Sequence, residues 1–133
     1  MSTLQIVGRN GGTVSLDAEK VQAFRSELRG SLLLPEDPGY EQARAVWNGM
    51  IDRRPGAIVR CLGVADVIRT VNLVREHGLL LAVRAGGHNI AGKSTCDGGV
   101  MLDLSLMKDV HIDPRARTAR VSAGADPRRL RPR

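Results

Sequence analysis

Residues 79–92 have the sequence Leu79-Leu80-Leu81-Ala82-Val83-Arg84-Ala85-Gly86-Gly87-His88-Asn89-Ile90-Ala91-Gly92. The apolar run 79–83 predicts a buried strand, and the glycine-rich segment after it predicts a loop at the strand end. Adjacent glycines allow successive backbone N–H groups to point into one concavity, a geometry that holds phosphate oxygens. The stretch therefore predicts an anion-binding loop that carries one imidazole.

The residues before this loop have the pattern of a strand, a helix and a second strand. Residues 57–61 predict a strand, and residues 65–77 predict a helix bounded by Gly63 and Gly78. The apolar residues expected on one face of that helix are Val67, Ile68, Val71 and Val74. Because a helix joins them, strands 57–61 and 79–83 are expected to be parallel, with a right-handed crossover.

Two helices and a loop are expected closer to the N-terminus. Residues 17–29 predict an amphipathic helix that ends at Gly30. Residues 34–39 are rich in helix breakers and predict a connecting loop. Residues 40–48 predict a short helix that buries Trp47.

Beyond the loop, residues 100–104 predict another strand, and residues 110–113 and 118–122 predict the two strands of a hairpin. His111 alternates with apolar residues in this hairpin and is expected to be exposed. The predicted fold class is therefore α/β (α+β): a parallel βαβ unit followed by a partial antiparallel sheet.

Charge and composition exclude several functions. The net charge is +6, but four arginines within the last six residues supply most of it: Arg128, Arg129, Arg131 and Arg133. With one Phe, one Tyr and one Trp, the chain has few aromatic side chains to stack on bases, so nucleic-acid binding is not expected. Cys61 and Cys96 belong to no metal-binding pattern. No apolar run approaches a membrane span, so we expect a cytoplasmic protein.

One short motif supports a different function. Residues 87–94 fit the GxxxxGK[ST] pattern of nucleotide triphosphatases, in which Lys93 would bind phosphate and Ser94 would bind magnesium. That motif requires a helix that starts at the Lys-Ser pair, but Gly98 and Gly99 follow closely and a strand comes next. A P-loop-like nucleotide-binding protein is retained as an alternative.

Two runs together resemble a known family. Arg84 to Asn89 with Gly92, and then residues 97–105, Asp-Gly-Gly-Val-Met-Leu-Asp-Leu-Ser, resemble the FAD-binding domain of the vanillyl-alcohol-oxidase (PCMH-type) flavoproteins. The berberine-bridge-enzyme and 6-hydroxy-D-nicotine-oxidase branch is the most similar. Further matching segments lie at residues 40–48, 54–59, 66–67 and 123–125, so the resemblance covers about residues 38–125.

The resemblance implies that the loop binds the pyrophosphate of FAD. The implied cofactor-binding residues are Arg84, Ala85, Gly86, Gly87, His88, Asn89 and Gly92. It also implies that His88 carries the flavin through an 8α-histidyl bond, as in many members, and that Asp103 orders a strand end. The implied function is that of a flavin-dependent oxidoreductase, an oxidase of a small organic substrate.

The chain departs from the family in length. Family members run to several hundred residues, so we expect an N-terminal fragment, produced by truncation or a frameshift and inactive alone. The expected division is an N-terminal helix and loop (1–37), the first part of a FAD-binding domain (38–127) and a basic tail (128–133). A non-catalytic fragment or interaction module is the other alternative, whose unpaired strand edges would favour self-association.

Overall fold

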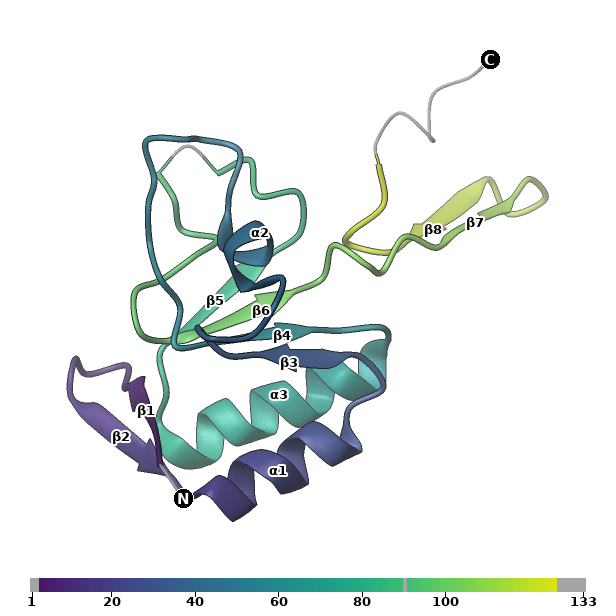
Figure 1. Ribbon diagram of the computed structural model, residues 1–133. Coiled ribbons are helices and arrows are strands. Elements are labelled where there is room, and N and C mark those ends of the chain that lie inside the picture. The colour runs from purple at the N-terminus through teal and green to yellow at the C-terminus, as the bar shows by residue number, and fades with distance from the viewer. Residues whose placement is uncertain (1–2, 90, 127–133) are drawn as a thin grey trace.

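The computed structural model describes residues 3–89 and 91–126 (Figure 1). The predicted basic tail lies outside the described residues. In chain order the elements are β1 (Leu4–Val7), β2 (Thr13–Leu16), α1 (Ala18–Glu27), β3 (Ser31–Leu33), α2 (Tyr40–Arg44), β4 (Ala57–Arg60), α3 (Val64–His77), β5 (Leu81–Arg84), β6 (Val100–Asp103), β7 (Val110–Asp113) and β8 (Thr118–Val121).

A four-stranded sheet of order β3-β4-β6-β5 forms the centre of the molecule. β3 is antiparallel to β4, and both β4 and β5 are parallel to β6. The expected parallel relation of β4 and β5 is confirmed, but they are not neighbours because β6 lies between them. β6 also extends the parallel part of the sheet rather than opening an antiparallel one, since segment 85–99 returns the chain to the amino ends of the strands. Local patterning does not encode which strands become neighbours.

Helices cover both faces of this sheet. Figure 1 shows α1 and α3 on one face and α2 on the other. Side chains that alternate along the strands form two separate apolar clusters. One contains Val59, Val100 and Leu102 together with Phe24 of α1. The other contains Ile58 and Met101 together with Tyr40 and Ala43 of α2.

Helix α3 has the expected ends but not the expected buried face. Gly63 is its N-cap, and Gly78 ends it in the left-handed conformation, with φ +60°. Val67 and Val74 pack against the core, whereas Ile68 and Val71 are 54% and 43% exposed. The prediction of one shared apolar face was therefore wrong for Ile68 and Val71.

Two expectations near the N-terminus are corrected. Helix α1 ends at Glu27, before Gly30. Gly30 instead allows the backbone to pass close to β4, because a Cβ there would lie 1.8 Å from the carbonyl oxygen of Arg60. Helix α2 ends at Arg44 because Ala45 has an extended conformation (φ −67°, ψ 135°). Trp47 consequently lies outside the helix and is 76% exposed rather than buried.

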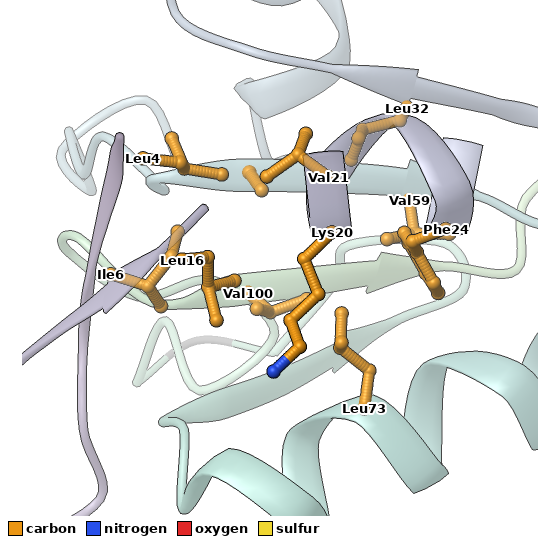
Figure 2. A pocket seen from close by; sticks show the side chains of 11 residues that line it. Leu4, Ile6, Leu16, Lys20, Val21, Phe24, Leu32, Val59, Leu73 and Val100 are labelled. Atoms are coloured by element: carbon orange, nitrogen blue, oxygen red, sulfur yellow. The ribbon is translucent and has the colours of Figure 1, made fainter. Parts of the chain in front are cut away.

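Two antiparallel hairpins lie outside the sheet. The second, β7–β8, is the predicted one, and His111 on it is exposed, as expected. The first, β1–β2, packs against α1 and the sheet. Figure 2 shows the apolar side chains of this hairpin, α1 and the sheet around a cavity of about 20 Å³. A cavity of that size holds about one water molecule, so it is a packing gap and not a ligand site.

Candidate cofactor-binding site

The three parallel strands end in register on charged residues. Arg60 of β4 and Arg84 of β5 both pair with Asp103 of β6, which lies between them. The Asp103 carboxylate accepts a hydrogen bond from the Ser105 N–H at 2.9 Å, and its Oδ2 atom lies 3.6 Å from Arg60 Nε. A cavity of about 190 Å³ opens beside these residues and Gln42. The carboxyl ends of parallel strands are the usual place for ligands in such sheets.

Arg84 links this edge to helix α2. Its Nη1 atom donates to the carbonyl oxygen of Ala43 at 2.6 Å. A Cβ on Gly87 would lie 3.1 Å from Arg84 Nε, so the guanidinium occupies the space beside that glycine. Arg84 therefore supports the loop by its hydrogen bond to the Ala43 carbonyl oxygen and by its contact with Gly87. Among the described residues, the ion pairs with carboxylates are all made by other arginines.

Glycine is required at two positions of the loop. Gly87 and Gly92 have φ values of +71° and +74°, in the left-handed region that favours glycine. A Cβ on Gly92 would also lie 2.9 Å from Ile51 Cδ1. The close approach of segment 46–51 to the loop thus depends on both glycines.

The loop has backbone donors without a described acceptor, on two exposed residues, Gly86 and His88, and on the buried Gly87. The N–H groups of Gly86, Gly87 and His88 donate to no other described residue. Neighbouring unpaired N–H groups at a strand end are suited to phosphate oxygens. The loop therefore fits the pyrophosphate of a dinucleotide cofactor.

The far end of the loop is held by a second arginine, which the sequence analysis missed. Arg53 Nη1 donates to the carbonyl oxygens of Gly92 at 3.1 Å and Thr95 at 3.3 Å. The side chain of Asn89 accepts from the Lys93 N–H at 3.2 Å and closes a turn within the loop. The sequence signal for this role is the pair Arg53-Arg54, which Pro55 and Gly56 separate from the predicted strand at residues 57–61.

His88 and Asn89 are exposed, and the imidazole of His88 has an aromatic neighbour. The ring centroids of Trp47 and His88 lie 5.2 Å apart, with the planes tilted by 36°. The backbone N–H of Trp47 donates to the Gly87 carbonyl oxygen at 2.9 Å. This contact was not foreseen, because Trp47 was expected in the core.

The geometry does not support the P-loop alternative. Residues 91–99 form turns and bends, and no helix begins at Lys93 or Ser94 in this described part of the loop. Without that helix, no row of N-terminal amides faces the phosphates. Lys93 is exposed, and the Ser94 hydroxyl is buried without a hydrogen-bond partner among the described residues.

The crevice at the carboxyl ends of parallel strands, where this glycine loop lies, is a usual place for nucleotide cofactors. The chain belongs to the FAD-binding domain family, whose model matches residues 55–132, more than half of its length. FAD is the cofactor of this family. The resemblance to PCMH-type flavoproteins is confirmed by relatives and by solved structures.

Among the relatives is (R)-6-hydroxynicotine oxidase of Paenarthrobacter nicotinovorans, 40% identical over 73% of this chain and 21% of that protein. An uncharacterised FAD-linked oxidoreductase of Bacillus subtilis is 29% identical over 77% of this chain and 23% of that protein. The present chain thus spans about a fifth of the length of the curated relatives it matches.

Solved structures give the same result. The 6-hydroxy-D-nicotine oxidase of Arthrobacter nicotinovorans has a TM-score of 0.70 and 40% identity, over 74% of this chain and 22% of the other. A carbohydrate oxidase from Microdochium nivale has a TM-score of 0.72 and 25% identity, over 83% and 24%. The predicted fold class is confirmed.

Both cysteines are free and buried. Burial raises the pKa of Cys61 to about 11 and also raises the pKa of Cys96. Both side chains therefore remain thiols near neutral pH and are poor nucleophiles. Of the helices in the described ranges, none combines the length and the apolar character needed to cross a membrane.

Proposed function

We propose that residues 84–92 hold the pyrophosphate of FAD in an oxidase that acts on a small organic molecule. The observation that carries the proposal is that the N–H groups of Gly86, Gly87 and His88, just beyond the carboxyl end of β5, donate to no other described residue. FAD, when bound, supplies a ring that accepts a hydride equivalent from the substrate. The protein supplies binding and orientation.

The residues of the loop divide into those that bind and those that position. Ala85, Gly86 and Gly87 would bind through their backbone; Gly86 is exposed, whereas Gly87 is buried beside Arg84. Arg84 fixes the start of the loop through Ala43, and Asn89 closes the turn that leads to Gly92. Arg84 also brings positive charge to the same edge, which favours an anionic ligand.

His88 is proposed as the point of covalent flavin attachment. Its imidazole is exposed, and a neutral imidazole nitrogen is a competent nucleophile toward the electron-poor 8-methyl carbon of oxidised FAD. Cys61 and Cys96 are buried thiols and do not compete for this role.

The wider biology is proposed from the relatives. One is named for the oxidation of 6-hydroxynicotine, and one solved neighbour is a carbohydrate oxidase, so the substrate is proposed to be a small organic molecule. The division at residues 37 and 127 remains a proposal, as do the inactivity of the chain alone and its self-association. A cytoplasmic location is also proposed, and the free thiols support it because reducing compartments keep cysteines unpaired.

Covalent attachment is tested by incubating the purified chain with FAD, denaturing it in acid and measuring flavin absorbance on the polypeptide. Wild type is expected to keep the flavin, and His88→Ala is expected to release it. His111→Ala is the matched control, because His111 is equally exposed but lies on the second hairpin. Wild type that binds FAD but loses it on denaturation would contradict the covalent role of His88, and wild type that binds no FAD would contradict the proposal as a whole.

The role of the glycines is tested by FAD affinity. Gly87→Ala forces a side chain into a φ of +71° and against Arg84, so we expect FAD binding to weaken by about tenfold. Gly11→Ala is the control, since Gly11 has a φ of +89° with nothing within 4 Å of the added Cβ. Lys93→Ala is expected to leave FAD binding unchanged, and a large loss there would favour the P-loop alternative.

A further inference from the structure

Trp47, the only tryptophan of the chain, is 76% exposed although its backbone is anchored. Its N–H donates to the Gly87 carbonyl oxygen at 2.9 Å, and the preceding helix is held where Arg84 donates to Ala43. An exposed indole gives up the stabilisation that burial of so large an apolar side chain in the core would provide. An anchored and exposed indole therefore calls for an explanation.

The indole contacts His88, whose imidazole also touches the backbone on its own loop. The two ring centroids lie 5.2 Å apart. A Cβ on Gly86 would lie 2.5 Å from Cδ2 of His88, so the imidazole lies directly against Gly86. Trp47 is anchored to Gly87, which is the residue directly before His88. Two contacts restrict a side chain that would otherwise sample several rotamers.

We propose that Trp47 is a positioning residue that holds the His88 imidazole in one orientation for flavin attachment. The inference rests on the proposed covalent role of His88. Attachment joins an imidazole nitrogen to the 8α carbon of FAD. Forming this bond would release one hydrogen from the imidazole nitrogen and one from the 8-methyl group, and the two protons and two electrons would pass to the flavin ring. Dioxygen would then reoxidise the ring and leave as hydrogen peroxide. Trp47 takes no part in these transfers; it reduces the conformational search of the nucleophile.

The contact itself is measured by tryptophan fluorescence, which reports only Trp47. The imidazole lies against the indole, so its removal in His88→Ala is expected to change the intensity or the maximum of the emission at one fixed pH. His111→Ala should leave the emission as it is in wild type. A wild-type emission that does not depend on His88 would overturn the proposal.

The functional role is measured by the rate of covalent FAD incorporation into the full chain. Trp47→Ala is expected to slow incorporation by about ten- to a hundredfold, while noncovalent FAD affinity stays unchanged. Trp47→Phe should restore most of the rate because it returns an aromatic ring. Circular dichroism should show the same thermal transition for all three proteins, since the indole is exposed.

The outcomes separate this inference from the function on which it rests. Incorporation into Trp47→Ala at the wild-type rate overturns the positioning role and leaves the covalent role of His88 intact. Wild type that binds FAD but never retains it after denaturation overturns the covalent role, and the positioning role with it. Equal loss of noncovalent affinity in Trp47→Ala and Trp47→Phe would instead assign Trp47 to FAD binding and overturn the proposal.

Discussion

The two hairpins of this chain have the same strand pairing and opposite surroundings. In the first, β1–β2, Ile6 is 1% exposed and Leu16 is 4% exposed. In the second, every residue of β8 is exposed, and Ile112 of β7 is 60% exposed. Figure 1 shows the second hairpin projecting away from the sheet, whereas the first lies against it.

The stability of a hairpin depends on the residues that pack against it. A two-stranded hairpin alone is marginally stable in water. The first hairpin gains backbone hydrogen bonds outside itself: Val7 N–H donates to Gly98, and Leu80 N–H donates to Val7, both at 2.9 Å. Gly98 lies just before β6, so these hydrogen bonds join the first hairpin to the amino end of the parallel strands.

The largest effect is expected from truncating the buried side of the first hairpin. Ile6→Ala should lower the free energy of unfolding by about 2–5 kcal/mol, because it removes apolar contacts and leaves a cavity in the main core. Urea unfolding followed by circular dichroism measures this change in the free energy of unfolding. An effect below about 1 kcal/mol would show that the first hairpin is no better integrated than the second.

A smaller effect is expected where the first hairpin meets Gly98. Gly98→Ala places a Cβ 2.5 Å from Val7 Cγ2 and also strains a φ of +72°. Gly11→Ala has the φ penalty alone, so the difference between the two variants isolates the contact. We expect the clash, taken as the difference between Gly98→Ala and Gly11→Ala in the same unfolding experiment, to cost about 1–3 kcal/mol.

The carboxylate of Asp66 makes the stability of the folded chain depend on pH. Burial alone would raise its pKa, but the N–H groups of Leu62, Arg29 and Gly30 donate to its carboxylate at 2.9–3.0 Å and hold the pKa below the ordinary value. Its contribution is therefore full above about pH 4 and is lost as pH falls through the lowered pKa.

Asp66→Asn should consequently cost about 1–3 kcal/mol at pH 7 and less at acid pH. Urea unfolding at both pH values measures the difference. Asp17→Asn is the control, because the Asp17 side chain makes no capping hydrogen bond. A cost for Asp66→Asn that is equal at both pH values would show that its charge does not contribute.

The smallest effect is expected on the second hairpin. Ile112→Ala should change the free energy of unfolding by no more than about 0.5 kcal/mol, since Ile112 is already exposed. Amide hydrogen exchange should likewise be faster in β7–β8 than in β1–β2. A loss comparable to that of Ile6→Ala would mean that the second hairpin is covered in solution.

Much of the fold follows from local sequence patterns. The helical spacing and the bounding glycines predicted α3, and the apolar runs predicted β4, β5 and β6 within a few residues. The first hairpin was missed although its signal exists: Leu4-Gln5-Ile6-Val7 and Thr13-Val14-Ser15-Leu16 alternate on either side of Gly11-Gly12. β3 was missed because three residues carry too little pattern.

The rest depends on contacts between distant segments. The place of β6 between β4 and β5 is set by tertiary packing. Trp47 lies beyond the end of helix α2, and its N–H donates to the Gly87 carbonyl oxygen, a hydrogen bond that no local pattern contains. The loop 84–92 was located from its glycines, but the supporting contacts of Arg53 and Arg84 become visible only when the sheet is assembled.

The middle position of β6 has a consequence for how the chain folds. β6 comes last of the sheet strands in the sequence, yet it provides the only pairing between β4 and β5. Until residues 100–103 leave the ribosome, both strands present open edges to other chains. The glycine loop lies between β5 and β6, so it is drawn into place when the sheet closes. We therefore expect synthesis of this protein to pass through an aggregation-prone stage that ends when β6 pairs and the glycine loop closes.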